Sequence, residues 1–211
     1  MLPDDRNDHT QTGIRMVHAG SRHLFRYWEA LRAERASPLR EEIDLRKISS
    51  LLPNITVIEE GQHRFWYHRM AGSGVCELLR EQVTGRDALL GFNRSARNAL
   101  LDLLQIATDS QQPIIMRLRL IGQHHIVPAE MLALPVRDVV KGKVQLFCGL
   151  QGFNAGTIVS GEPLLRRELI STRLIPTEHG STKNNSNMYK KPQLHLIHGG
   201  LSQSPHFLTA N

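Results

Sequence analysis

The residues with the most chemical potential in this sequence are two cysteines and a scattered set of eleven histidines. Cys76 and Cys148 lie far apart, and each has apolar neighbours, as in Leu146-Phe147-Cys148-Gly149-Leu150. Two thiols cannot build a disulfide scaffold and cannot alone hold a zinc ion. We therefore interpret both cysteines as small core residues.

One group of residues has the types that bind metals, namely His124, His125 and Glu130. Successive residues of a strand point to opposite faces, so two adjacent imidazoles would not converge on one ion. The histidines near the C-terminus are scattered through polar sequence: His179, His195, His198 and His206. The sequence therefore predicts no metal site, and we expect these histidines to be exposed to solvent.

Short motifs of several enzyme classes are absent from the sequence. There is no Gly-x-Ser-x-Gly, no Walker loop, no Gly-x-Gly-x-x-Gly and no His-Glu-x-x-His. No catalytic residues are predicted, and we do not expect an enzyme.

Composition narrows the class of protein that could position such residues. The chain has 211 residues, 40% hydrophobic and 22% charged, which is enough for a packed core. No apolar run approaches the roughly 20 residues that span a bilayer, and the polar, acidic N-terminus does not resemble a secretory signal. We expect a cytoplasmic protein without a membrane segment. The net charge of +6 is spread over interspersed residues, which is typical of a mixed solvated surface.

The sequence divides into three parts. Residues 1–20 read as a flexible arm, residues 21–155 as one domain, and residues 156–211 as a largely flexible extension. An N-terminal helix is predicted over about 22–36, capped by Ser21 and ended by Ser37-Pro38.

The periodicity of the domain alternates between strands and helices. The predicted helices cover about 44–51 and 95–109, with short helical pieces in 75–92 and a short amphipathic helix in 164–170. The predicted strands cover about 55–59, 63–70, 113–121, 125–136 and 144–151. Strands interrupted by one helical block indicate an α+β fold with a five-stranded antiparallel sheet.

This order, with the helical block between the second and third strands, resembles the PAS domain. More specifically, the chain is similar to the bacterial single-domain PAS family over about 21–153. The stretches that carry the resemblance are the helix with Trp28 and Leu31, Leu51-Leu52-Pro53-Asn54, Tyr67-His68-Arg69-Met70-Ala71-Gly72, Val83-Thr84-Gly85-Arg86 and Leu134-Pro135-Val136-Arg137-Asp138.

The resemblance implies a sensory or protein-interaction module with room for a small, largely apolar ligand between the sheet and the helical block. The alternative is that the same side chains simply fill the core. The residues expected to line this space are Val75, Leu79, Phe92, Leu100, Leu103, Met116, Leu118, Leu132, Leu146 and Cys148.

Two cofactors of PAS domains can be compared with the sequence. Covalent flavin chemistry uses a cysteine in an Asn-Cys-Arg-Phe-Leu-Gln-like motif, whereas Cys76 lies in Val-Cys-Glu-Leu-Leu-Arg. Haem needs an axial ligand, and the long helix 95–109 has no histidine. Neither flavin nor haem is therefore expected. The histidines left as haem ligand candidates are His63, His68, His124 and His125.

The N-terminal helix has a strong apolar stripe, and PAS domains often dimerise through such a helix. We predict a homodimer in which this helix packs on the outer face of the sheet; the alternative is that the helix packs only on its own domain. The residues predicted at this interface are Leu24, Trp28, Leu31, Ile115, Ile121 and Phe147.

The functional expectation is a regulatory module with a protein partner, in which occupancy of the core or partner docking changes how the N-terminal helix and the tail pack. The alternative is a regulator associated with nucleic acid, whose binding would weaken steeply with salt. It is suggested by the basic charge and by the arginines Arg22, Arg26, Arg32, Arg166 and Arg167.

Overall fold

The computed structural model describes residues 15–153 and 163–177, all within one structural unit. The predictions of a flexible arm over 1–20 and a largely flexible extension over 156–211 therefore lie mostly outside the described residues.

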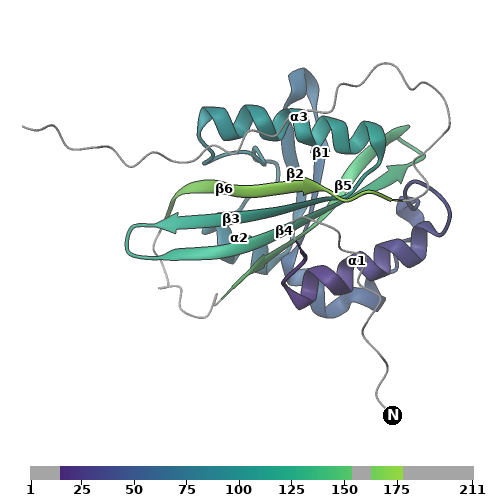
Figure 1. The fold of residues 1–211 in the computed structure, drawn as a ribbon, viewed down its shortest axis with the longest axis horizontal. Helices are drawn as coiled ribbons and strands as arrows, with labels where there is room; N and C mark the ends of the chain where they lie inside the picture. Colours follow the sequence, from purple (N-terminus) through teal and green to yellow (C-terminus); the bar gives the residue numbers. More distant parts are fainter. Residues whose placement is uncertain (1–14, 154–162, 178–211) are drawn as a thin grey trace, which may run out of the picture. The chain divides into compact units, whose positions relative to one another are not determined.

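The core of the fold is a six-stranded sheet in which every neighbouring pair of strands is antiparallel (Figure 1). The strand order is β2-β1-β5-β4-β3-β6. The α+β class and the five predicted strands are confirmed. The strands are β1 (Ile55–Glu60), β2 (Trp66–Ala71), β3 (Ile114–Gly122), β4 (Ile126–Asp138), β5 (Lys143–Gly152) and β6 (Leu164–Leu174).

The sixth strand corrects the sequence prediction, which placed a short helix at 164–170. β6 pairs with β3 from Ile114↔Leu174 to Gly122↔Leu164. A short segment with apolar residues on both sides of three charged residues fits either helix or strand, so local pattern does not decide its structure. The free edge of β3 decides it here, because pairing satisfies the backbone groups that the edge would leave open.

The helices form close to the predicted positions, but the N-terminal helix ends at Arg32 and not at Ser37-Pro38 as predicted. Helix α1 covers Ala19–Arg32, and its N-cap is His18, whose Nδ1 accepts a hydrogen bond from the Gly20 N–H at 3.0 Å. The predicted cap, Ser21, instead lies buried inside the first turn. Helix α2 covers Ser73–Leu79, and α3 covers Arg94–Ser110.

The predicted helix at 44–51 is a 3₁₀ helix, η2 (Leu45–Asn54), in which two short pieces meet at a kink at Ile48. It continues through Pro53 to Asn54, beyond the predicted end at about residue 51. Two further 3₁₀ turns are η1 (Arg40–Glu42) and η3 (Gln62–Arg64).

The sheet carries an apolar cluster on each face. On one face, α2, α3 and the segment 80–92 cover the inner cluster, which includes Leu100, Leu118 and Leu146. On the other, α1 and η2 cover the outer cluster, which includes Leu24, Trp28 and Leu132. Figure 1 shows α3 and α1 on opposite sides of the sheet. Each residue of a central strand therefore faces one of two separate packed layers.

The outer cluster occupies the surface predicted for dimerisation. Leu24 and Trp28 are fully buried against their own sheet, and Trp28 Nε1 donates a hydrogen bond to the Pro135 carbonyl at 2.7 Å. Ile115, Ile121 and Phe147 are buried as well, and Leu31 is half-buried. These residues do not present a free interface, because α1 packs on its own domain. The homodimer itself stays a prediction.

Candidate functional site

A small cavity of about 30 Å³ lies within the inner cluster, between the sheet and the helical segments. Every strand of the sheet contributes to its wall. Most of its lining is apolar: Ile58, Leu79, Ala88, Leu89, Phe92, Leu100, Leu104, Met116, Leu118, Leu120, Met131 and Leu150. Three polar side chains complete it, namely Thr56 from β1, His68 from β2 and Arg167 from β6.

The structure places nine of the ten residues predicted around a ligand on this side of the sheet. Those that line the cavity are Leu79, Phe92, Leu100, Met116 and Leu118. Those that pack in the same cluster without lining the cavity are Val75, Leu103, Leu146 and Cys148.

Leu132 is the exception, since it lies in the outer cluster, while its neighbour Met131 lines the cavity. Both faces of β4 are apolar, so hydrophobic alternation could not indicate which residues point inward.

His68 is the most constrained polar group of the cavity. Its side chain is 2% exposed, and its backbone is held by the His68 N–H to Arg86 carbonyl bond at 2.9 Å. Nδ1 lies 2.8 Å from the Thr56 hydroxyl, which donates its own hydrogen to the Met70 carbonyl at 2.7 Å. Because a hydroxyl has one hydrogen, Nδ1 must be the donor to Thr56. The proton therefore sits on Nδ1, and Nε2 carries a lone pair.

That lone pair has no protein partner: Nε2 of His68 is buried and accepts no hydrogen bond from any described residue. Burial, together with the positive charge of Arg167, lowers the pKa of His68 to about 4, against an opposing effect of Asp87. The imidazole is thus neutral at pH 7, and its Nδ1–H still donates to Thr56.

Arg167 places a cation in the same apolar surroundings. The residue is 7% exposed, its Nη1 donates to the Ala88 carbonyl at 3.2 Å, and its backbone N–H donates to the Gly91 carbonyl at 2.8 Å. Burial lowers the pKa of Arg167 to about 10, which Glu81 and Asp87 partly oppose from a distance. The guanidinium therefore remains charged at neutral pH.

Sequence reasoning placed none of these three polar residues in the pocket. The only functional role considered for His68 was that of a haem ligand. Its position within the predicted strand 63–70 was the one signal that could have indicated burial. Arg167 was assigned to a helix and to a basic surface. Thr56 fits a strand at any depth, so its type carried no signal.

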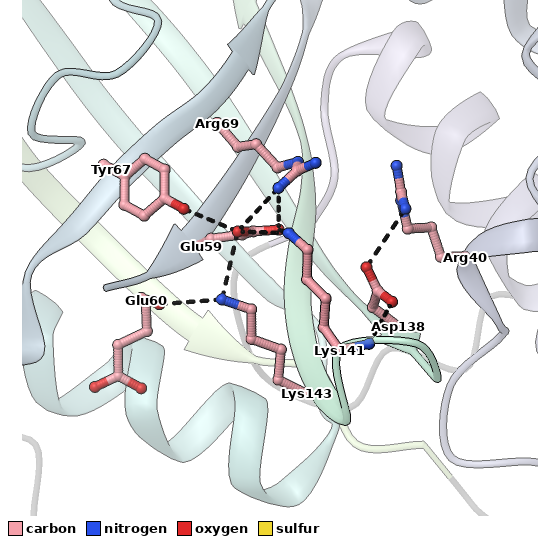
Figure 2. Close-up of polar contacts among 8 residues, drawn as sticks. All are labelled: Arg40, Glu59, Glu60, Tyr67, Arg69, Asp138, Lys141 and Lys143. Carbon is pink, nitrogen blue, oxygen red and sulfur yellow. Dashed lines mark hydrogen bonds and ion pairs between the residues drawn. The ribbon is translucent and has the colours of Figure 1, made fainter. Parts of the chain in front are cut away.

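A second polar cluster surrounds the buried carboxylate of Glu59 on β1 (Figure 2). Lys141 Nζ lies 2.9 and 3.2 Å from its two oxygens, and the Tyr67 hydroxyl donates to it at 2.9 Å. Arg69 and Lys143 each approach to 3.4 Å. The cluster links β1, β2 and the β4–β5 turn.

Burial alone would raise the pKa of Glu59. The hydrogen bonds from Lys141 and Tyr67 and the charges of Lys143 and Arg69 outweigh it and bring that pKa to about 2. A carboxylate held ionised so firmly cannot serve as a proton acceptor at neutral pH. We interpret the cluster as a structural tie between strands.

An open groove of about 600 Å³ lies near this tie, between η1, the start of η2 and the ends of β1, β2 and β4. Three of its lining residues are large apolar side chains exposed to solvent, Leu45, Met70 and Val140, the last 95% exposed. Charged groups from Arg40, Arg69 and Asp138 alternate with them. The groove thus has the mixed character of a protein contact surface.

The remaining chemical candidates lie apart from the cavity. Within the described ranges no three His, Cys, Asp or Glu side chains come together as a metal site. The prediction assumed that His124 and His125 lie on a strand. In the structure they lie in the turn between β3 and β4. Cys76 and Cys148 are buried free thiols, and burial raises the pKa of the Cys148 thiol.

The arginines that suggested nucleic acid binding do not form one surface. Arg32 is buried and pairs with Glu29 at 3.3 Å, while Arg167 faces the core. Arg22 and Arg166 are exposed. Two of the five are therefore unable to reach a phosphate backbone.

Comparison with known proteins identifies a family. A family model described as a PAS domain matches residues 16–151, the segment from just before α1 to β5. No curated protein matches the chain. None of the helices in the described ranges has both the length and the apolar character needed to cross a membrane.

Proposed function

The chain belongs to the PAS domain family, whose domains serve as sensory or regulatory modules, and from that premise we propose that it reads a small molecule in its core and passes the signal through protein contacts. The proposal contains no chemical step on the ligand.

One observation supports the ligand more than any other, which is the set of polar groups in the cavity wall. A packed core gains nothing from a buried cation and an unpartnered imidazole nitrogen, because unpaired buried polar groups cost stability. Such groups are retained where they fix the orientation of a ligand in an otherwise apolar pocket. His68, Thr56 and Arg167 are placed to do this.

The route from the cavity to the surface runs through β4. Met131 lines the cavity, and the adjacent Glu130 points to the opposite face. The Glu130 carboxylate is fully buried and accepts hydrogen bonds from the backbone N–H groups of Val17 and His18 at 2.9 and 3.1 Å, and it forms an ion pair with Arg117. A shift of β4 at the cavity would therefore move the start of α1.

The output would be a change in how α1 and its surroundings contact another chain, in line with a two-state module. The groove beside η1 and η2 offers exposed apolar side chains for such a partner. A second copy of this chain remains one candidate partner. Nucleic acid is less favoured, because two of the five arginines that suggested it are buried.

The proposal predicts that the full chain keeps a small molecule through purification. Native mass spectrometry is expected to show an added mass that denaturation releases. Returning the released compound to the emptied chain is expected to slow hydrogen exchange at the cavity wall and also at the start of α1. A chain that retains nothing, or whose exchange changes only at the cavity, would contradict the proposal.

Glu130→Gln provides the matched variant for this route, since it keeps the shape of the side chain and removes its charge. We expect it to bind the compound as the natural chain does, while exchange at Val17 and His18 stays fast with and without it.

A further inference from the structure

The cavity contains a buried cation without an anionic partner. Within the residues that the structure describes, no carboxylate lies within 4.0 Å of the Arg167 guanidinium, and its side chain makes a single protein hydrogen bond, to Ala88. A guanidinium has five N–H donors in a rigid fork. A buried charge with so little compensation is costly, and an anion at the cavity would remove that cost.

The same cavity contains a hydrogen-bond acceptor without a donor. The contact between His68 and Thr56 places a proton on Nδ1, so in the neutral imidazole Nε2 accepts and does not donate. Arg167 does not fill this role, because no hydrogen bond joins it to His68 among the described contacts. The cavity therefore needs two things from a ligand: an acceptor for Arg167 and an O–H or N–H donor for His68.

Around these two groups the wall is apolar and mostly aliphatic, with leucines from α2, α3, β3 and β5, with Met116 and Met131, and with Phe92 as the one aromatic ring. A ligand that matches Arg167, His68 and the apolar wall has an anionic head group, a hydrogen-bond donor close to that head group and an apolar body. The proximity of a guanidinium argues against a metal cation or metal-bound cofactor on Nε2, because like charges repel strongly in a low-dielectric core.

Resting on the function proposed above, we propose that the cavity binds a small aliphatic hydroxy acid, with its carboxylate on Arg167 and its hydroxyl donating to Nε2 of His68. The bidentate fit of a carboxylate to a guanidinium gives this contact both strength and direction. Arg167 lies in β6, beyond the segment 16–151 that the family model covers, so this specificity belongs to the C-terminal part of this chain.

The size of the cavity indicates how the ligand enters. About 30 Å³ holds one or two water molecules, so a hydroxy acid must widen the space. Two bonds close the wall at this point, both made by Arg167, to the carbonyls of Ala88 and Gly91. A carboxylate competes with the Ala88 carbonyl for the guanidinium. The segment 88–92 is therefore the part of the wall that must open for the ligand to enter.

The test is calorimetric titration of the full chain with 3-hydroxyhexanoate, hexanoate and the neutral 1,3-hexanediol. The expected order of affinity is hydroxy acid, then plain acid, then diol. Arg167→Met is expected to weaken the hydroxy acid at least tenfold. Arg166→Met is the matched control, because it removes the same charge from the exposed neighbouring position, and it is expected to change nothing.

Two further variants separate a loss of ligand contacts from a loss of folding. Arg167→Lys retains the charge and is expected to retain part of the affinity even if Arg167→Met folds poorly. His68→Phe is expected to abolish the preference for 3-hydroxyhexanoate over hexanoate and to leave hexanoate affinity within a factor of about three.

The assignment falls if the diol binds as well as the acids, if Arg166→Met weakens binding as much as Arg167→Met, or if none of the three compounds binds. A neutral compound retained through purification would overturn this assignment and leave the proposed sensing function standing. An acid that binds through Arg167 without changing exchange at α1 would support the assignment and contradict the proposed signal route.

Discussion

At the scale of single residues, the proposed ligand contact depends on a histidine that is neutral at pH 7. His68 donates through Nδ1 to Thr56, and its pKa in the folded chain is about 4 compared with an ordinary 6.5. The unfolded chain therefore binds the proton more readily than the folded chain over this range. Stability is complete above pH 6.5 and is lost as the pH falls through that window.

This difference predicts a measurable pH dependence of folding. Between pH 7.5 and pH 5, His68 should cost the natural chain about 2 kcal/mol of unfolding free energy, because one pKa unit corresponds to about 1.4 kcal/mol. His68→Gln should remove that part of the slope in urea unfolding. His23→Gln, at an exposed position of α1, should leave the slope unchanged. Equal slopes in the natural chain and the His68 variant would refute the assignment.

The Glu59 carboxylate titrates in a lower range. Its pKa falls from 4.5 to about 2 on folding, so its contribution is present above pH 4.5 and is lost as the pH falls towards 2. Because its cationic partners are partly exposed, we expect Glu59→Gln to cost about 1 to 3 kcal/mol at pH 7 and little at pH 2.

Glu60→Gln is the control for this effect, since the Glu60 carboxyl points away from the cluster in Figure 2. Chemical unfolding at pH 7, 4 and 2 would measure both variants. A loss for Glu60→Gln as large as that for Glu59→Gln would mean that charge in general, and not this cluster, stabilises the sheet.

The polar residues of the cavity could not be predicted from the sequence, because they come together only when segments far apart in the chain fold against each other. Thr56 and Arg167 are separated by more than 100 positions and come from strands that are not neighbours in the sheet. Apolar lining residues were easier to predict, since helical spacing in Leu100 and strand alternation in Met116 and Leu118 already assign a face.

At the scale of elements, the turn between β2 and α2 shows how closely the chain packs. A Cβ on Gly72 would lie 2.3 Å from the Leu52 carbonyl oxygen and 2.4 Å from that of Pro53. The Gly72 N–H also donates to the Ile55 carbonyl at 2.8 Å, which fixes the turn against the start of β1. Backbone atoms cannot rotate away as a side chain can, so no larger residue fits.

Gly72→Ala is therefore expected to lower the free energy of unfolding by about 3 kcal/mol, at the upper end of the usual cost of overpacking. Ser73→Ala changes the next, exposed position and is expected to cost less than about 0.5 kcal/mol. Thermal and urea unfolding measure both. A Gly72 variant as stable as the Ser73 variant would show that the turn can move away from η2.

Two elements illustrate where local pattern stops being informative. The segment 164–170 reads as a helix until the open edge of β3 is known, and pairing with that edge makes it a strand. Likewise, the apolar stripe of α1 indicates that this helix face is buried. It does not indicate whether the helix packs on its own sheet or on a second chain. In the structure α1 packs on its own sheet, and Gly149 makes this close packing possible. A Cβ at Gly149 would lie 2.8 Å from Leu24 Cδ2, so the absence of a side chain there lets Leu24 approach the sheet.

At the scale of the whole molecule, the α+β class and five of the six strands followed from sequence because turns and alternation are local signals. The assignment of each strand face to a layer did not, because the sheet is buried on both sides. β4 has Met131 and Ala133 in the inner layer and Leu132 and Leu134 in the outer one. Because both faces of β4 are apolar, only the three-dimensional structure shows which residues face the cavity and which pack against α1 and η2.

Among the described residues, Arg167 on β6 is the one charged side chain that lines the cavity, and the other five strands contribute apolar side chains or the neutral polar groups of Thr56 and His68. On the ligand assignment proposed above, substitutions confined to β6 would change which compounds the cavity selects. They would leave the contacts between β4 and the start of α1 unaltered.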